Sequence, residues 1–404
     1  MQNKTSKVAP LFILNATFFI WGVITALTSV SVPYIKEHYS LTNTSASFIS
    51  LIFFCAPFLA SIPMGWVMTA FGYRKALKSS YWLAILGCGI ITLAYQSHSF
   101  GLLCVGVLFI ALAVAAMQVV ANPYLAALGS AASVPGRLSL ASSINSFGTV
   151  VAPLSAAFIL GGFYQFSVQE QSARLTLIYG ILLLFILGLI LLSRLTRLTR
   201  LPDVEISGED KSDFAENIRA LFGNKFFSLS ALAIFCYVGA EVAVAVNTVI
   251  YLTEPSLGNL SIKEAAALIS LYWAGAMIGR LLYGCVASRV NLTYLMVVCT
   301  SIPASLILMS MLLSNQYSGY LLLLIGLTNS VIYPVIYSLV INNIPKRLIP
   351  IASAVLIMAG LGGAVIPSIQ ALLSDMSGVI YGFAIPMLSY LYLFIYTVKQ
   401  RHHF

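Results

Sequence analysis

The chain has 404 residues, of which 60% are hydrophobic and only 8% are charged, and its formal net charge is +9. A soluble globular domain carries about a quarter of charged residues, so this composition excludes a soluble protein and indicates a polytopic membrane protein. The basic excess is therefore no argument for nucleic-acid binding, and the positions of the basic residues carry the information instead.

A hydropathy pass predicts the membrane-spanning helices, because about 20 apolar residues are needed to cross a bilayer. Twelve segments meet this requirement: residues 10–32, 46–71, 78–97, 100–128, 139–163, 174–196, 228–253, 263–287, 292–313, 318–343, 350–374 and 379–398. The first segment is too long for a signal peptide and lacks a convincing cleavage site, so we interpret it as a span.

Lysine and arginine are distributed unequally between the two sides of these spans. One side holds only Lys36, Arg174 and Lys263, and all other basic residues fall on the opposite side. The positive-inside rule then places both termini and the long central loop in the cytoplasm.

The longest interruption of the apolar pattern runs from Arg194 to Lys225. It divides the chain into two six-helix halves, residues 1–196 and 228–404, joined by a cytoplasmic linker at 197–227. We interpret the linker as a solvated segment with an amphipathic helix at the membrane surface.

The two halves repeat a pattern of glycine and proline. Gly148 precedes Pro153 by five residues, and Gly362 precedes Pro367 by the same spacing. A second correspondence joins Asn122, Pro123 and Tyr124 to Tyr333 and Pro334. Such residues in matching positions of two halves predict broken or flexible helices around a central site.

Polar side chains recur at helical spacing inside several spans, among aromatic residues. Amides and hydroxyls beside rings suit a sugar, whose hydroxyls need donors and acceptors while its CH faces pack on rings. The candidate substrate ligands are Trp21, Thr25, Gln118, Asn122, Asn145 and Tyr333. The alternative is structural: hydroxyls in membrane helices bond their own backbone, and Asn122 could cap a helix break at Pro123.

Glu241 is the only carboxylate near the middle of a long apolar segment. A charge at the bilayer centre costs at least about 2.5–3.5 kcal/mol on insertion scales, so such a group usually serves a function. We expect no Lys, Arg or His at its depth, since the four histidines fall at 38, 98, 402 and 403. Glu241 is therefore the predicted cation-coupling residue; the alternative is a protonated, hydrogen-bonded core acid.

The sequence lacks the motifs that enzymes, metal sites and nucleotide-binding proteins need. The six cysteines show no CxxC spacing, and no GxxxxGK[ST] phosphate loop is present. The sequence thus predicts neither an enzyme nor a protein that needs a metal or cofactor.

The loop GWVMTAFGYRK resembles the loop motif of the major facilitator superfamily: Gly65, Gly72, Arg74 and Lys75 fit, and Thr69 replaces the usual Asp. Ser288 and Arg289 give a partial second copy. The resemblance implies an all-α membrane protein with the major facilitator fold, twelve transmembrane helices in two six-helix halves. Arg74, Arg280 and Arg289 are then expected at a cytoplasmic gate.

Within that superfamily the chain resembles the fucose and glucose/galactose symporter family. The matching stretches are FFIWGVITALTSVSVP, ANPYLAALG, RLSLASSINSFG, FCYVGAE, YPVIYSLVINNI and LIMAGLGGAVIP. Proton-coupled fucose permeases carry acids at the positions of Ser29 and Gln118, so both expected carboxylates of the first half are absent here. Gln118 and the FCYVGAE glutamate instead resemble the glucose/galactose branch.

We therefore predict a secondary transporter of the bacterial inner membrane, taking up a hexose or related small sugar by symport with a cation. A proton at Glu241 is the first choice and sodium the second, and a monomer is expected because one chain holds a complete pathway. Three alternatives stay open: a sugar facilitator without coupling, an efflux antiporter of a small metabolite or drug, and a receptor that binds without transport.

Overall fold

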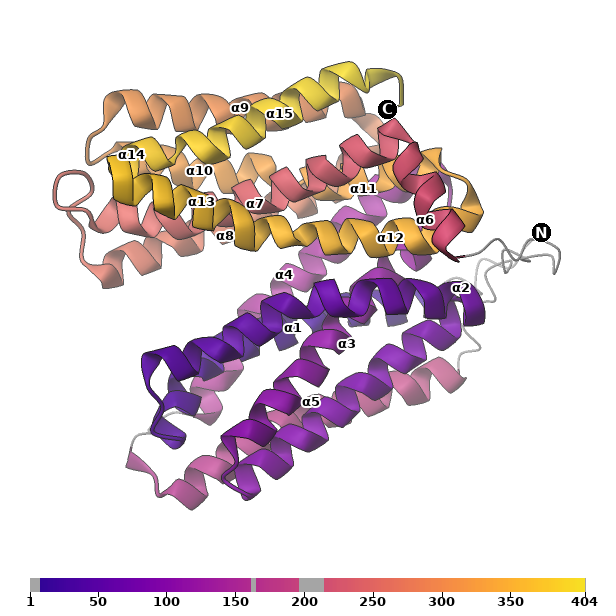
Figure 1. The fold of residues 1–404 in the computed structure, drawn as a ribbon, viewed down its shortest axis with the longest axis vertical. Helices are drawn as coiled ribbons and strands as arrows, with labels where there is room; N and C mark the ends of the chain where they lie inside the picture. Colours follow the sequence, from indigo (N-terminus) through magenta and orange to yellow (C-terminus); the bar gives the residue numbers. More distant parts are fainter. Residues whose placement is uncertain (1–7, 161–164, 196–213, 404) are drawn as a thin grey trace. The chain divides into compact units, whose positions relative to one another are not determined.

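The computed structural model describes residues 8–160, 165–195 and 214–403, and every regular element in these ranges is a helix (Figure 1). The early helices are α1 (Val8–His38), α2 (Asn43–Gln96), α3 (Phe100–Ala127), α4 (Val134–Ile159), α5 (Val168–Leu195), α6 (Phe214–Gly223) and α7 (Lys225–Thr253). The later ones are α8 (Ile262–Val286), α9 (Leu292–Leu313), α10 (Ser318–Asn329), α11 (Ile332–Asn343), α12 (Ile349–Met358), α13 (Gly362–Ser377), α14 (Val379–Gly382) and α15 (Ala384–Lys399).

Ten helical stretches of the described chain are long and apolar enough to cross a membrane. One of them lies in α2, which contains the two predicted spans 46–71 and 78–97 and is interrupted at Gly72. Gly72 has φ 77° and ψ 164°, a conformation open to glycine because it lacks a Cβ atom. The predicted span 139–163 corresponds to α4, which is not among the ten.

The chain divides into two compact units. The first comprises the described parts of Met1–Leu128, Ile144–Ser212 and Ile349–Ile357, and the second those of Gly129–Ser143, Asp213–Leu348 and Met358–Phe404. Each unit thus includes a short segment from the opposite half of the sequence. The predicted domain limits at 196 and 228 stay a prediction. Residues 197–213 of the predicted linker lie outside the described residues, and the remainder of the linker contains α6.

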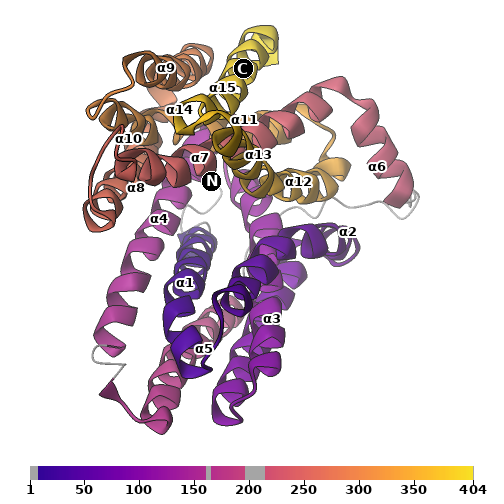
Figure 2. The same cartoon turned by 60° about the vertical axis from the view of Figure 1, so that its left-hand side comes forward.

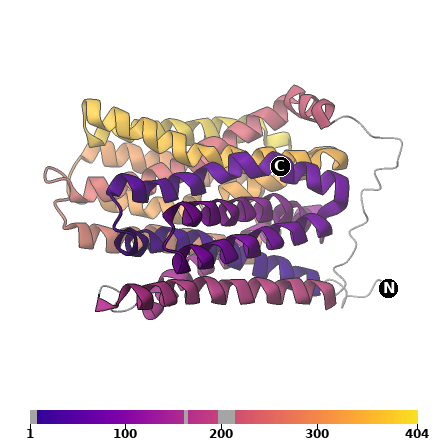
Figure 3. The ribbon, with the colours of Figure 1, turned by 60° about the horizontal axis from the view of Figure 1, so that its bottom comes forward.

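Within each unit the long helices run alongside one another (Figure 3). In the first unit α3 and α5 pack against α2, and α1 packs against α3. In the second unit α7 packs against α13 and α15, while α9 lies between α10 and α15 (Figure 2). Each helix makes its backbone hydrogen bonds within itself, as a lipid environment requires.

Equivalent glycines sit at equivalent helix contacts in the two units. A Cβ atom on Gly148 would collide with the carbonyl oxygen of Phe19, and one on Gly362 would collide with that of Phe235. Leu140 and Ala354 are also at equivalent positions, because they are separated by the same number of residues as Gly148 and Gly362. Each packs on a glycine of a neighbouring helix, Leu140 on Gly284 of α8 and Ala354 on Gly65 of α2. These contacts support the predicted duplication of a six-helix unit.

The predicted helix breaks occur in the second half of the sequence only. One break separates α10 from α11 just before Tyr333, and a 3-10 turn at Ala359–Leu361 separates α12 from α13. At Pro123, where the sequence predicts a broken or flexible helix, α3 continues without a break. Proline removes the N–H that would bond the carbonyl of Val119, but the Ser353 hydroxyl donates to that carbonyl at 2.7 Å. The break expected around Gly148 and Pro153 is also absent from α4.

Candidate functional site

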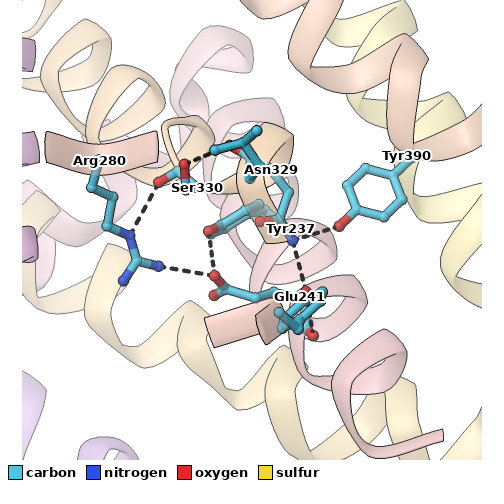
Figure 4. Close-up of polar contacts among 8 residues, drawn as sticks. Tyr237, Glu241, Arg280, Asn329, Ser330 and Tyr390 are labelled. Atoms are coloured by element: carbon cyan, nitrogen blue, oxygen red, sulfur yellow. Dashed lines mark hydrogen bonds and ion pairs between the residues drawn. The ribbon is translucent and has the colours of Figure 1, made fainter. Parts of the chain in front are cut away.

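A buried ion pair lies in the second unit, between α7 and α8 (Figure 4). Glu241 stands one helical turn after Tyr237, so the two side chains share a face, and the Tyr237 hydroxyl donates to Glu241 Oε1 at 2.8 Å. Arg280 donates to the same oxygen from Nη2 at 2.9 Å. The side chains of Arg280 and Glu241 are only 15% and 11% exposed.

The break between α10 and α11 supplies a second acceptor for Arg280. Pro334 has no N–H, so the carbonyl of Ser330, four residues earlier, loses its helical partner. Arg280 Nε donates to that carbonyl at 3.3 Å. Gly279 permits this approach, since a Cβ atom there would collide with Ser330 and Leu327. The guanidinium therefore links Glu241 to the broken helix.

Tyrosines and an asparagine surround the pair. The Tyr272 hydroxyl donates to the carbonyl oxygen of Glu241 at 3.0 Å. Asn329 donates from Nδ2 to the hydroxyls of Tyr272 and Tyr390, at 2.8 and 3.0 Å. The Oδ1 atom of Asn329 is buried and has no hydrogen-bond partner in the described part of the chain. Buried polar networks of this kind fix one arrangement when satisfied and are costly to disturb.

The expectation that no cation pairs with Glu241 is wrong. Sequence position places Arg280 near the cytoplasmic end of its span, but its long side chain reaches Glu241 on the neighbouring helix α7. Tyr272 and Arg280, two turns apart on α8, both contact Glu241. Helical spacing within one segment could not reveal this, because it says nothing of the register between α7 and α8.

The ion pair determines what the site can do chemically. Removing one partner of a buried pair costs about 3–5 kcal/mol, because the other charge is left without compensation. The Glu241 carboxylate therefore holds the Arg280 guanidinium, which also bonds the Ser330 carbonyl at the break between α10 and α11. The site thus compensates a buried charge and connects α7 and α8 to the broken helix.

The candidate ligands in the first unit mostly bond backbone carbonyls. Thr25 Oγ1 donates to the Trp21 carbonyl at 2.8 Å, and Asn122 Nδ2 to that of Gln118 at 2.8 Å. Asn145 Nδ2 donates to the Phe18 carbonyl at 3.0 Å, which ties α4 to α1 beside Trp21. Asn122 is buried, whereas the other four side chains are half-buried. Their predicted contact with substrate stays a prediction.

The other predicted residues lie apart from the ion pair. Tyr333 is half-buried and stacks on Tyr337 with ring centroids 5.8 Å apart. Arg74 follows the Gly72 interruption of α2 and is half-buried, while Arg289 is exposed at the end of a 3-10 turn. Their roles at a gate stay predictions.

Five members of the network were not among the predicted site residues: Tyr237, Tyr272, Asn329, Ser330 and Tyr390. Ser330 had a signal in the sequence, since a proline inside a helix frees the carbonyl four residues before it. Tyr272 and Tyr390 had none, because a buried tyrosine in an apolar helix is indistinguishable from ordinary packing.

Helices of this length with a paired charge inside them define a polytopic α-helical membrane protein. The family model of the Major Facilitator Superfamily matches residues 13–367, and the chain belongs to this superfamily. The predicted fold class, the family resemblance and the absence of an enzyme are confirmed by this match and by the relatives below.

Two curated relatives match almost the whole chain. The glucose/galactose transporter of Brucella abortus (strain 9-941) is 29% identical over 384 residues, covering 95% of this chain and 92% of that protein. The putative glucose/galactose transporter of Helicobacter pylori (strain J99) is 30% identical and covers 98% of each. The crystal structure of the Escherichia coli fucose:proton symporter matches with a TM-score of 0.85 and 24% identity, covering 98% of this chain and 99% of that one.

Proposed function

We propose that the protein takes up a hexose or a related small sugar by symport with a proton, through alternating access. The buried pair of Glu241 and Arg280 is the observation that carries this proposal. Relatives at about 30% identity are described as glucose/galactose transporters, which supports a sugar as substrate. The candidate ligands are the amides, hydroxyls and rings at Trp21, Thr25, Gln118, Asn122, Asn145 and Tyr333. The membrane is a bacterial inner membrane, with both termini in the cytoplasm.

Glu241 is the coupling residue in this proposal, and Arg280 is its counter-charge rather than a gate residue. With Glu241 ionised, the pair is neutral and the arrangement around α7, α8 and the α10–α11 break is stable. With Glu241 protonated, Arg280 carries an uncompensated charge in a largely buried position, which favours a conformation in which it reaches water or substrate hydroxyls. A ligand shifts such an equilibrium by its difference in affinity for the two states.

The test is uptake of labelled glucose, galactose and fucose into proteoliposomes under imposed proton or sodium gradients. We expect accumulation driven by the proton gradient in the intact protein. Glu241→Gln should abolish accumulation while counterflow persists, because binding and exchange need no net proton movement. Glu264→Gln is the matched control: this acid is exposed at the start of α8, and glutamine keeps the capping box with Ser261.

The same assay distinguishes a facilitator. Glu241 already has a counter-charge, so a permanently ionised pair would leave the protein without a titrating group at this position. Equilibration of sugar without accumulation, unaffected by Glu241→Gln, would replace symport by facilitated diffusion. If none of the sugars moves under any gradient, the sugar assignment fails.

A further inference from the structure

Ser139 and Ser353 are at equivalent positions in the two halves of the sequence. Each lies in the short segment that belongs to the unit formed mainly by the opposite half. The spacing between Ser139 and Ser353 equals that between Gly148 and Gly362. Both serines are fully buried. Ser139 lies in Gly129–Ser143 of the second unit and Ser353 in Ile349–Ile357 of the first. Each donates its hydroxyl to a main-chain carbonyl of a neighbouring helix, Arg280 at 2.8 Å and Val119 at 2.7 Å respectively.

Close helix contacts surround both hydrogen bonds. Along the start of α4, a Cβ atom on Gly136 would lie 2.8 Å from that of Ala287, and Leu140 packs against Gly284. In the other unit a Cβ atom on Gly65 would lie 2.9 Å from that of Ala354. Small residues let helix backbones approach in a membrane, so that hydroxyl groups can bond across the contact. The geometry around the two serines is therefore similar.

The acceptors differ in kind. The carbonyl of Val119 is freed by Pro123, and Ser353 supplies the hydrogen bond that proline removes. The carbonyl of Arg280 is followed four residues later by Gly284, which has its N–H, so Ser139 adds a bond to a helix that is already intact. The Ser353 bond thus repairs a helix. The bond from Ser139 holds the main chain of the residue whose side chain pairs with Glu241.

We propose that Ser139 is a positioning residue for the Glu241–Arg280 pair and links that pair to the packing of residues 129–143. Arg280 is held at both ends, its carbonyl by Ser139 and its guanidinium by Glu241 and the Ser330 carbonyl. When Glu241 loses its charge and the guanidinium moves, the Ser139 bond weakens. By linkage, release of residues 129–143 lowers the stability of the ion pair by the same free energy. This inference rests on the proposed role of Glu241 in coupling.

The test is a double-mutant cycle read by amide hydrogen exchange in lipid nanodiscs, where Glu241→Gln mimics the protonated acid. One buried hydrogen bond is worth a factor of about five in a local opening equilibrium. We expect Ser139→Ala to speed exchange in residues 129–143 about fivefold, and Glu241→Gln to do likewise. In the double mutant the two factors should not multiply, because each change removes the same link.

Ser353→Ala is the matched control. It deletes an equally buried hydroxyl bond, and should speed exchange in residues 349–357 by a factor that multiplies with the effect of Glu241→Gln. Ser139→Thr, which keeps a hydroxyl, should restore the coupling. Independent effects of Ser139→Ala and Glu241→Gln would overturn the proposal. The exchange cycle needs no sugar, so its result is separate from a failure of the uptake assay, which would count against the proposed function alone.

Discussion

Helices α1 and α7, which match each other in the two halves of the sequence, show what the two halves do differently. Gly148 packs against the carbonyl of Phe19 in α1, and the equivalent Gly362 packs against that of Phe235 in α7. When the two helices are aligned on these phenylalanines, Trp21 matches Tyr237 and Thr25 matches Glu241. In α1 the hydroxyl of Thr25 bonds back to its own helix. In α7 the carboxylate at that position bonds a tyrosine and an arginine. The same helical position is therefore neutral in one unit and charged in the other.

The partner helix shows the same difference. Ser61 lies four residues before Gly65, and Arg280 lies four residues before Gly284. These two glycines pack against Ala354 and Leu140, which come from the opposite half of the sequence. Ser61 is buried, and its hydroxyl has no hydrogen-bond partner among the residues described. The first unit thus has hydroxyls where the second has an ion pair. We infer that coupling chemistry is confined to the second unit, and four predictions test this asymmetry.

The largest expected effect comes from breaking the ion pair. Arg280→Met leaves a buried carboxylate without its counter-charge and the Ser330 carbonyl without its donor, so the free energy of unfolding should fall by about 3–5 kcal/mol. Adding Glu241→Gln should recover most of this loss, because the uncompensated charge disappears. Thermal unfolding in detergent measures both variants. A double mutant no more stable than Arg280→Met would show that the pair contributes through packing instead.

The features that could be predicted from the sequence are those that depend on a single segment of the chain. Apolar length predicted the spans, the isolation of Glu241 singled it out, and the spacing of Gly148 and Gly362 indicated the duplication. Arg280 was missed as its partner because the register between helices is a property of packing. The same limit explains Pro123: proline predicts a freed carbonyl, but not that a serine more than two hundred residues later bonds it.

The equivalent glycines provide a test of the symmetry itself. Gly148→Ala and Gly362→Ala each place a methyl group against a backbone carbonyl, of Phe19 and Phe235, where flexible side chains cannot relieve the clash. Overpacking of this kind costs about 1–3 kcal/mol. We expect similar losses of thermal stability for the two variants. Gly188→Ala is the control, since nothing lies within 4 Å of a Cβ atom there. A loss in only one of the two variants would contradict the duplicated packing.

A smaller, pH-dependent effect is expected at the far end of α1. His38 is buried, with Nδ1 at 3.3 Å from Gln171 Oε1 and its ring stacked on His98. Burial lowers the pKa of His38, and the charge on His98 lowers it further, against the opposing effect of Gln171. Because the folded pKa lies below the unfolded value of about 6.5, the unfolded chain binds more protons as the pH falls. Stability from this group is full above that pH and is lost below it.

At the start of α8, in the second unit, Glu264 is not expected to reduce stability between pH 7.5 and 5.0. The pKa of Glu264 is lowered by hydrogen bonds from the side chain and backbone of Ser261, so this acid stays ionised well below neutrality. Thermal unfolding between pH 7.5 and 5.0 should therefore show a decline that His38→Gln reduces and Glu264→Gln leaves unchanged. An identical decline in the His38 variant would exclude this histidine as its source.

The smallest effect is expected at Thr25, the counterpart of Glu241. Its hydroxyl donates within its own helix, so Thr25→Val should change the free energy of unfolding by less than about 1 kcal/mol. Thr25 is a candidate substrate ligand, so the loss of its hydroxyl should raise KM about threefold with kcat unchanged. Thr25→Ser keeps the hydroxyl and should keep the KM. Glu241→Gln should show the reverse pattern, with accumulation lost and KM for exchange little altered. If Thr25→Val instead abolished accumulation, the first unit would take part in coupling and the division of labour between the two units would fail.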